Sequence, residues 1–331
     1  MTQPPRTYHR PIPDPEGGVH RLAGGWVRFT RFEVLQRGAP PRIVTEAPDR
    51  VMAALTTPRP ALMGLSMDRP RLMGIVNATP DSFSDGGAYD PEAQGAALIA
   101  AGADLLDVGG ESTRPGAAEI TRATEIARLR PTLAALAGRV PLSVDTRKAA
   151  VAEAALRMGA GMVNDVSGFD FDPDLPTVVA RHAVPVCLMH ARGLPQTMQD
   201  DPIYDDVVLD VYDALEARVA RAEAAGIARD RIVVDPGIGF GKTGAHNLAI
   251  LRRISVFHGL GCPILLGVSR KGFIGTIGGG APAGARMPGT LALTLAAIAQ
   301  GVQVHRVHDV AGIAQGIRLW QSVTDSERAE R

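Results

Sequence analysis

The 331-residue sequence predicts an α/β fold, a (β/α)8 TIM barrel with an N-terminal extension. Eight short apolar runs recur between residues 71 and 322, and each one ends in or carries a polar residue. Helix-length segments separate these runs. Parallel strands are buried on both faces, so they read as continuous apolar stretches. Polar residues where such strands end are typical of an active site at the mouth of a barrel.

The eight predicted strands are rich in Val, Ile and Leu, and Gly, Pro and Asp punctuate the chain between the units. They are LMGIVN (72–77), DLLDVGG (104–110), VPLSVD (140–145), GMVND (161–165), VPVCLMH (184–190), RIVVD (231–235), PILLGVSRK (263–271) and VQVHRVHD (302–309). Helical spacing of apolar residues marks segments 90–101, 122–136, 147–158, 172–182, 206–225 and 245–257. A doubly wound open sheet is the alternative fold. Even spacing of the units and the lack of a dinucleotide fingerprint in the first turn argue against it.

Three regions follow from this pattern: an extension over residues 1–70, the barrel over 71–322 and a tail over 323–331. Residues 1–20 are rich in Pro, Gly and charge, which predicts irregular structure. Residues 25–36 alternate enough to form one strand or half of a hairpin. Residues 48–65 predict a short helix and a linker. We expect the extension to act as a cap or packing element.

Charge and composition exclude several classes of function. Lys and Arg number 35 and Asp and Glu number 35, so nothing favours a nucleic acid or an anionic membrane as partner. Cys187 and Cys262 lie in apolar runs without a CxxC pattern, which predicts buried core residues. The N-terminus has no apolar region typical of a secretory signal, and no apolar run is long enough to span a bilayer. We therefore expect a cytoplasmic enzyme.

A polar loop, NATPDSFSDGG (77–87), directly follows the first predicted strand. Its turn-forming residues could make an ordinary βα connection, but that reading does not explain why such a loop contains Phe83. An aromatic contact, carboxylates and a glycine hinge suit a loop that closes over a substrate. Asn77 offers a neutral oxygen to a hard cation such as Mg²⁺, which takes few protein ligands and binds phosphate oxygens and water.

Two further places offer groups for an anion. The loop GGESTRPG (109–116) provides the Thr113 hydroxyl and the Arg114 guanidinium, although a solvated arginine loop is the ordinary alternative. Arg306 and His308 are two residues apart on the last strand, so both should point to the same face. A lone histidine is usually a core residue, but this pair at a strand end favours a phosphate, which barrels often bind near strands 7 and 8.

Polar side chains at three other strand ends should converge on the barrel mouth. Asp145, Asn164 and Asp235 could form a structural network with backbone amides. They could instead meet the N–H and NH₂ groups of a flat heterocycle, because an amide both donates and accepts on one ring edge. Lys271 would then donate to a ring atom, and a helix that starts near it would add backbone N–H donors.

The segment PGIGFGKT (236–243) is similar to a phosphate-binding loop but does not match one. The pattern GxxxxGK[ST] needs glycine at position 236, which is Pro236, and a GxGxxG match fails at Lys242. The glycines more simply allow a tight turn and a close approach to a flat ligand.

Taken together, these motifs resemble the dihydropteroate synthase family. The matching stretches are MGIVNATPDSFSDGG (73–87), GGESTRPGA (109–117), SVDTRKAAV (143–151), MVNDVSG (162–168), LMHARGLPQTMQ (188–199), DPGIGFGKT (235–243), GVSRKGFIG (267–275) and RVHDV (306–310). They are long, separate and in the expected order across residues 71–322. The resemblance implies that the amine of 4-aminobenzoate displaces diphosphate from (7,8-dihydropterin-6-yl)methyl diphosphate, with the help of Mg²⁺. It also implies a homodimer and a target of sulfonamides.

The resemblance also implies a role for each matching residue. The pterin would be bound by Asp145, Asn164, Asp235, Lys271, Met189 and Phe240. The diphosphate would be bound by Thr113, Arg306 and His308, and the metal by Asn77. The 4-aminobenzoate would be bound by Phe83, Arg114 and Pro115. Asp85 and Lys271 would act in catalysis, Asp85 by stabilising positive charge on the pterin methylene.

Two positions depart from the family pattern, because Gly272 replaces a common hydroxyl residue and Arg192 replaces an uncharged one. A methyltetrahydrofolate–corrinoid methyltransferase would share the pterin-binding residues but would not need TPDSFSD or SRK, which are both intact. A non-catalytic pterin-binding paralogue should have lost a metal ligand or damaged its loops, yet Asn77, Asp85 and Arg114 are present. A nucleotide-binding protein is already disfavoured by the spacing around GFGKT.

Overall fold

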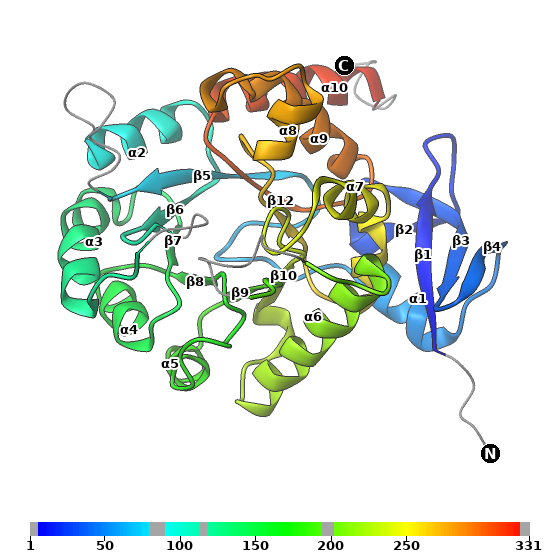
Figure 1. Ribbon diagram of the computed structural model, residues 1–331, viewed down its shortest axis with the longest axis horizontal. Coiled ribbons are helices and arrows are strands. Elements are labelled where there is room, and N and C mark those ends of the chain that lie inside the picture. Colours follow the sequence, from blue (N-terminus) through cyan, green and yellow to red (C-terminus); the bar gives the residue numbers. More distant parts are fainter. Residues whose placement is uncertain (1–5, 80–89, 113–117, 194–201, 325–331) are drawn as a thin grey trace.

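Two sheets organise the chain in the computed structural model, which describes residues 6–79, 90–112, 118–193 and 202–324. One is an eight-stranded parallel sheet curved into a barrel, and the other is a four-stranded antiparallel sheet near the N-terminus. Helices surround the barrel, while the small sheet stands to one side of it (Figure 1). The predicted α/β fold, a (β/α)8 TIM barrel with an N-terminal extension, is confirmed.

The barrel strands are neighbours in the order β10–β9–β8–β7–β6–β5–β12–β11. Their bounds are β5 (Arg71–Asn77), β6 (Leu105–Gly109), β7 (Leu142–Asp145), β8 (Met162–Asp165), β9 (Val186–Met189), β10 (Ile232–Asp235), β11 (Leu265–Leu266) and β12 (Val304–Val307). The ring is nearly closed, because Val234 of β10 forms a parallel bridge with Ile264 just before β11. The Val234 N–H donates to the Pro263 carbonyl at 3.0 Å in the same place. Each strand lies in the apolar run that predicted it, apart from shifts at the ends.

The barrel helices are α2 (Pro91–Ala100), α3 (Arg122–Leu136), α4 (Ala149–Arg157), α5 (Leu175–His182), α6 (Val207–Ala224), α7 (Gly244–Arg252), α8 (Gly272–Ile277), α9 (Met287–Ile298) and α10 (Val310–Thr324). Side-chain caps start several of them: Thr121 accepts the Thr124 N–H at α3, and Asp206 accepts two N–H groups at α6. The prediction of one helix over 245–257 is wrong. Arg253 leaves helical geometry (φ −123°, ψ 20°), and Ile254–Leu260 continues as a 3₁₀ helix, η4.

Residues inside the barrel form two layers along the strand direction. The lower layer is apolar and contains Met73, Leu105, Met162, Cys187, Val233, Leu265 and Val304. Side chains two residues apart on a strand share a face, so the next inward position is two residues later. At that level four of the strands carry polar side chains instead, which are Asp107, Asn164, Asp235 and Arg306. The apolar layer thus forms the floor on which a polar layer lies at the carboxyl ends of the strands.

The N-terminal sheet contains β1 (Thr7–Pro13), β2 (His20–Arg21), β3 (Arg28–Gln36) and β4 (Ala39–Val44), and helix α1 (Asp49–Thr56) follows it. The strand expected within residues 25–36 and the short helix are therefore confirmed. The expectation of irregular structure over residues 1–20 is wrong for Thr7–Pro13. This segment tolerates two prolines because β1 is an edge strand that pairs with β3. Tyr8 is buried and anchors the strand.

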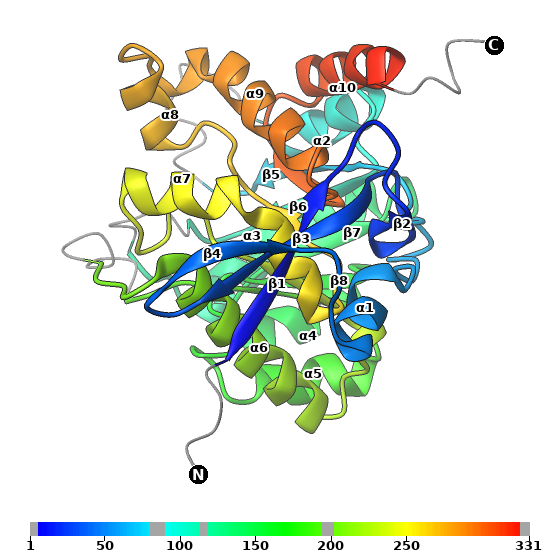
Figure 2. The ribbon, with the colours of Figure 1, turned by 90° about the vertical axis from the view of Figure 1, so that its right-hand side faces the viewer.

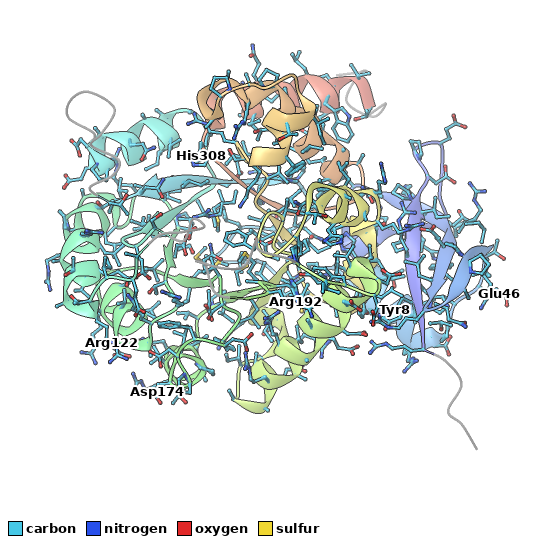
Figure 3. All side chains as sticks on the ribbon, in the orientation of Figure 1. Tyr8, Glu46, Arg122, Asp174, Arg192 and His308 are labelled. Atoms are coloured by element: carbon cyan, nitrogen blue, oxygen red, sulfur yellow. The ribbon has the colours of Figure 1, made fainter. Side chains whose placement is uncertain are left out.

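The extension packs against the side and the base of the barrel. Figure 2 shows the small sheet face-on over α6, and Figure 3 places Tyr8 at this junction. The Tyr8 hydroxyl donates to Asp213 of α6 at 2.8 Å, and Arg37 pairs with the same carboxylate. Leu62 and Met67 are 2% exposed and join the apolar floor from below. These contacts agree with the expected packing role.

Both cysteines are fully buried and free, as expected for core residues. Cys187 lies in the apolar floor, and Cys262 precedes β11 in the outer core. Within the described part of the chain, no helix has the length and apolar character needed to cross a membrane.

Candidate functional site

Four residues lie at one level across the carboxyl ends of neighbouring strands. Asn77, Gly109, Asp145 and Asn164 are register partners in turn across β5, β6, β7 and β8. The Asp145 and Asn164 side chains are buried, since their residues are 4% and 3% exposed. Gly109 lies directly beside Asp145, because a Cβ on Gly109 would be 3.5 Å from the Asp145 Cβ, an ordinary van der Waals contact. The structure therefore brings together residues that the sequence analysis placed at separate strand ends.

One arginine connects the acids of this polar layer. Arg306 Nε donates to Asp107 Oδ2 at 2.6 Å, and Arg306 Nη2 donates to Asp145 Oδ2 at 2.8 Å. Asn164 Nδ2 also donates to Asp107 Oδ2, at 2.9 Å. The network links β6, β7, β8 and β12 and leaves Asp107 fully buried. Two of the five guanidinium N–H donors of Arg306 are used in these bonds, so donors remain for another group.

Two carboxylate oxygens in the network have acceptor capacity that the described residues do not use. Asp107 Oδ1 and Asp145 Oδ1 are buried, and no described group donates to them. A buried acceptor without a donor is costly, so this geometry suits a ligand with N–H groups. Burial raises the pKa of Asp145 to about 7, against the attraction of Arg306 and with the repulsion of Asp107.

Asp235 ends β10 and is held by the loop that follows it. Its Oδ1 accepts the Gly237 N–H at 2.7 Å. Burial raises the pKa of Asp235 to about 6, while that hydrogen bond and the positive charges of Lys271 and Lys242 oppose the rise. Met189, at the end of β9, is its register partner and is 3% exposed.

The glycines after Asp235 are required by the path of the backbone. Gly237, Gly239 and Gly241 have φ values of +66°, +81° and +60°, which other residues rarely adopt. A Cβ on Gly237 would lie 1.8 Å from the His190 carbonyl oxygen, and one on Gly241 would lie 2.4 Å from the Arg192 carbonyl oxygen. The prediction that these glycines allow a tight turn is confirmed, and the loop lies directly on the segment after β9.

Lys242, at the end of this loop, is 2% exposed. Its Nζ lies 2.9 Å from His190 Nδ1 and 2.9 Å from the Gly237 carbonyl oxygen. It also donates to the Phe240 carbonyl at 3.0 Å. Burial lowers the pKa of Lys242 to about 7, against the attraction of Asp235. This lysine points into its own loop rather than toward a nucleotide.

Lys271 directly precedes α8 and lies over an aromatic ring. Its Nζ is 4.1 Å from the centre of the Phe240 ring, within the range of a cation–π contact. The predicted helix start next to Lys271 is confirmed, because α8 begins at Gly272. Lys271 and Phe240 thus form one wall beside Asp235.

His308 follows β12 and contacts Ser269, which lies shortly after the neighbouring strand β11. Its Nδ1 lies 2.9 Å from Ser269 Oγ, and its backbone N–H donates to the same hydroxyl at 3.1 Å. Arg306 instead points to the two acids across the barrel. The pair therefore stands at the end of one strand, with Arg306 in the acid network and His308 against Ser269.

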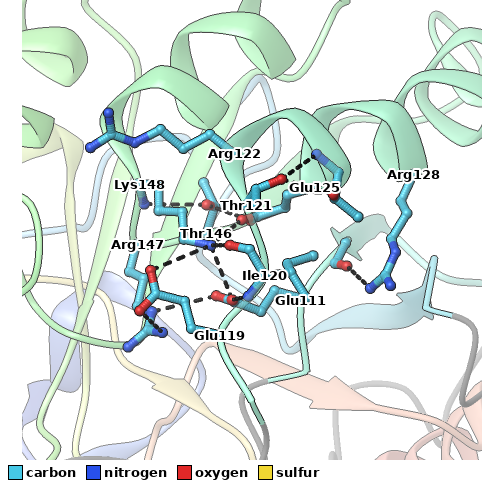
Figure 4. Close-up of polar contacts among 12 residues, drawn as sticks. Glu111, Glu119, Ile120, Thr121, Arg122, Glu125, Arg128, Thr146, Arg147 and Lys148 are labelled. Carbon is cyan, nitrogen blue, oxygen red and sulfur yellow. Dashed lines mark hydrogen bonds and ion pairs between the residues drawn. The ribbon is translucent and has the colours of Figure 1, made fainter.

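A second buried charge cluster lies beyond β6 and β7 (Figure 4). Lys148 Nζ donates to Glu111 Oε1 at 3.0 Å, to Glu125 Oε2 at 3.0 Å and to the Ile120 carbonyl at 2.6 Å. Glu111 Oε1 also accepts the Ile120 N–H at 2.8 Å. The cluster ties Glu111 to Ile120, although nine residues separate them in the sequence.

Several predicted site residues lie outside the described residues, and their contacts stay predictions. They are Phe83, Asp85, Thr113, Arg114 and Pro115. Arg192, for which the sequence offered no role, now has contacts: its guanidinium donates to the Ile203 carbonyl and lies 4.9 Å from the centre of the Tyr204 ring.

Sequence reasoning assigned no site role to two residues that now stand out. Asp107 lies within an apolar strand run, so its carboxylate is expected to be buried. A buried carboxylate needs hydrogen-bond donors, and this requirement could have indicated a polar network around Asp107. For Lys242, the sequence suggests only a phosphate-binding loop, which the spacing of the glycines does not match. A buried lysine in a glycine-rich loop that binds no phosphate needs other acceptors for its N–H groups. The backbone carbonyls of the loop are the nearest ones.

Comparisons with known proteins agree with this geometry. The family model described as "Pterin binding enzyme" matches residues 73–308. A dihydropteroate synthase of Neisseria meningitidis serogroup B is 46% identical over 270 residues, which cover 78% of this chain and 94% of that protein. Xanthomonas albilineans dihydropteroate synthase with 4-aminobenzoic acid superimposes with a TM-score of 0.75 at 45% identity, covering 80% of this chain and 97% of that one.

A second structure of the Xanthomonas albilineans enzyme, in complex with 7,8-dihydropteroate, has a TM-score of 0.71 at 41% identity and covers 79% of this chain and 96% of that one. The likeness spans the barrel and nearly the full length of these relatives. The chain therefore belongs to the pterin binding enzymes and, among them, to the dihydropteroate synthase family.

Proposed function

We propose that this chain is a transferase that joins (7,8-dihydropterin-6-yl)methyl diphosphate to 4-aminobenzoate, giving 7,8-dihydropteroate and diphosphate for folate biosynthesis. Membership of the dihydropteroate synthase family supports this reaction. The observation that carries most weight is the buried polar layer, in which Asp107 Oδ1 and Asp145 Oδ1 still need donors. The edge of a pterin provides such N–H and NH₂ donors beside acceptor atoms.

In this proposal the pterin lies flat on the apolar floor of the barrel. Asp145 and Asp235 accept N–H groups of the ring from β7 and β10, and Asn164 both donates and accepts between them. Lys271 donates to a ring oxygen or nitrogen from the opposite side. The burial of Asp145, Asn164 and Asp235 supports strong hydrogen bonds, because little water competes there.

Apolar and aromatic groups complete the pterin site. Met189 ends β9 next to Asp235, and its polarisable sulfur suits contact with a flat ring. Phe240 comes from the glycine loop and is fixed beside Lys271. Because the loop backbone carries no Cβ at Gly239, a planar ligand can approach it closely.

The diphosphate would lie above the pterin, toward Thr113, Arg306 and His308. Arg306 keeps unused N–H donors after binding Asp107 and Asp145, and these can stabilise negative charge on the leaving group. His308 stands at the end of the same strand. The strand ends of β11 and β12 correspond to a common phosphate position in barrels.

Mg²⁺ fits this arrangement through Asn77. Asn77 ends β5 in register with Gly109, at the level of the acids, and its amide oxygen is a hard donor. In the described ranges, no three His, Cys, Asp or Glu side chains gather as a metal site. Because Mg²⁺ takes few protein ligands, we expect an ion held mainly by substrate oxygens and water, with Asn77 as its protein ligand. When bound, the ion would neutralise charge on the departing diphosphate.

The reaction exchanges one bond at the pterin methylene. The C–O bond to diphosphate breaks, and its electron pair leaves with the oxygen. The 4-aminobenzoate nitrogen forms the new C–N bond and then loses a proton to water. Asp85 stabilises positive charge on the methylene as the bond breaks, while Lys271 holds the pterin that shares this charge. As the family resemblance implies, Phe83, Arg114 and Pro115 would bind 4-aminobenzoate, and the guanidinium of Arg114 would suit its carboxylate.

We also propose that the enzyme is a cytoplasmic homodimer, as the family resemblance implies. The balanced charge of the chain is consistent with small-molecule partners rather than nucleic acid or a membrane.

Diphosphate release by the purified protein tests the proposed function. The protein receives the pterin diphosphate and Mg²⁺, with and without 4-aminobenzoate, and the product is identified by mass. We expect release that depends on 4-aminobenzoate, together with dihydropteroate. Tight pterin binding without turnover would contradict the reaction and leave a non-catalytic pterin-binding protein.

Asp85→Ala is expected to lower kcat by roughly 100-fold, because charge that develops in the transition state loses its carboxylate. Binding of the pterin diphosphate should change by only about twofold, since the ground state carries little of that charge. Steady-state kinetics and calorimetry measure the two effects. Equal losses in kcat and in affinity would assign Asp85 to substrate binding instead.

Pterin affinity is expected to fall at low pH. Burial raises the pKa of Asp235 to about 6 and that of Asp145 to about 7, so both carboxyls take up protons as the pH falls below 7. A protonated carboxyl has lost its charge and has an O–H donor in place of an acceptor, so it binds pterin N–H groups more weakly, and Kd should rise by up to about tenfold per pH unit per proton.

Calorimetry with 6-hydroxymethyl-7,8-dihydropterin from pH 8.5 to 5.5 avoids titration of the diphosphate. We expect a constant Kd in the upper part of this range and a rising Kd in the lower part. A flat profile throughout would mean that neither carboxyl binds the pterin as an anion.

A further inference from the structure

Lys242 is a buried lysine whose hydrogen bonds all lie within the segments that surround the pterin site. Its acceptors are His190 Nδ1 and the carbonyl oxygens of Gly237 and Phe240, at 2.9 to 3.0 Å. A fourth contact, to the His190 carbonyl oxygen, is longer at 3.2 Å. In the described part of the chain, this lysine forms no ion pair with a carboxylate.

The three short contacts match the three N–H donors of an ammonium group. When Lys242 is protonated, His190 Nδ1 accepts one of these hydrogen bonds, and the neutral ring then carries its proton on Nε2. Burial also lowers the pKa of His190 well below its ordinary value, and the charge of Lys242 lowers it further. Lys242 therefore fixes the ring of His190 together with the backbone of the glycine loop.

The loop wraps around this ammonium group. The Phe240 N–H donates to the Gly237 carbonyl at 3.1 Å, which closes a turn whose two carbonyls both point to Lys242. On its outer side the turn presents the Phe240 ring to Lys271. At its start, the Gly237 N–H holds Asp235. One buried lysine thus sets the backbone between two side chains of the pterin site.

We propose that Lys242 is a positioning residue for pterin binding, which it serves by holding the glycine loop so that Phe240 and Asp235 face the ligand. This inference rests on the proposed function, because it assumes that the pterin lies between these side chains. Lys242 itself does not touch the substrate. Its effect should appear in the affinity for the pterin and not in the affinity for 4-aminobenzoate.

Arg59 provides a matched control at the other end of the barrel. It is also buried, at 7% exposed, and its guanidinium donates to the carbonyls of Ala54, Thr57 and His258. Like Lys242, it satisfies buried carbonyls without a carboxylate among these partners. Arg59→Met should therefore lose similar hydrogen bonds and lower the thermal stability, with no path to the pterin site.

Calorimetry with 6-hydroxymethyl-7,8-dihydropterin compares the parent protein with Lys242→Met, Lys242→Gln and Arg59→Met. We expect Lys242→Met to raise Kd by about tenfold or more, and Arg59→Met to leave it within about twofold. Lys242→Gln keeps two N–H donors, so its Kd should lie between those of the parent and Lys242→Met. The KM for 4-aminobenzoate should stay within about twofold of the parent value in all folded variants.

A Kd within twofold of the parent value in folded Lys242→Met would overturn the inference. If that variant does not fold, the same criterion applies to Lys242→Gln. A parent protein that fails to bind the pterin contradicts the proposed function instead, so the two failures are distinguishable.

A double-mutant cycle with Phe240→Leu tests the route through the loop. If Lys242 acts by placing Phe240, the double variant should have about the same Kd for the pterin as the single variant with the higher Kd. Fully additive losses in affinity would show that Lys242 does not act through Phe240 and would overturn that part of the inference.

Discussion

Asp235→Asn is expected to weaken pterin binding by roughly 100-fold or more, which is about 3 kcal/mol of binding free energy. The asparagine keeps the size of the side chain and an oxygen for the Gly237 N–H. It replaces the second acceptor oxygen with an N–H donor, which then faces the N–H groups of the ring. Calorimetry at pH 8, where the carboxyl is ionised, measures the loss.

The stability of the same variant separates a binding role from a structural one. Burial raises the pKa of Asp235 to about 6, above its value in the unfolded chain. The folded state therefore holds the proton more tightly, and ionised Asp235 destabilises the fold as the pH rises through 6. Asp235→Asn should accordingly be as stable as the parent at pH 8 or more stable. Lower stability with unchanged pterin affinity would mean that Asp235 is structural.

Most of the barrel could be predicted from sequence because its strands are buried on both faces. Apolar runs such as RIVVD are typical of strands in a parallel sheet, and Gly, Pro and Asp are frequent in the segments between them. The edge strand β1 could not be found in this way. Its sequence, TYHRPIP, contains two prolines and little alternation, and it is stabilised by pairing with β3 and by Tyr8 against α6.

The site could be predicted only in part, because the sequence indicates which residues lie at strand ends but not which side chains they bind. Asp145, Asn164 and Asp235 were expected at the barrel mouth, and the register places them there. Arg306 was expected to face a phosphate, yet its guanidinium bonds lie with acids from β6 and β7. Those acids are 199 and 161 residues away in the chain, so no local pattern reveals the pairing.

The glycine loop shows a different limit. The sequence revealed that its glycines permit a tight turn, but not that Lys242 lies inside the turn. A lysine beside glycines usually suggests an anionic ligand. Here the acceptors are carbonyls of the loop itself, and only the three-dimensional path shows that they converge.

Arg306→Met is expected to destabilise the protein by about 3–5 kcal/mol at pH 8, because it leaves buried acids without their cation. Asp107 is fully buried and Asp145 nearly so, and Arg306 donates to both. The parent ion pairs themselves need not add much stability, since desolvation offsets their attraction. Removing one partner is different, because the remaining charges cannot reach water. Chemical denaturation gives the free energy of unfolding for both proteins.

The loss in unfolding free energy caused by Arg306→Met should become smaller as the pH falls. This pH dependence distinguishes the effect of unpaired buried carboxylates from the effect of lost packing. Attraction by Arg306 opposes the rise in the pKa of Asp145, so the variant should have a still higher value. A folded state that holds protons more tightly than the unfolded chain gains stability as the pH falls through that value. The deficit at pH 5.5 should therefore be smaller than at pH 8. Arg306→Met combined with Asp107→Asn should recover part of the loss at pH 8, because one stranded charge is removed. An equal deficit at both pH values, with no recovery, would mean that Arg306 acts through packing alone.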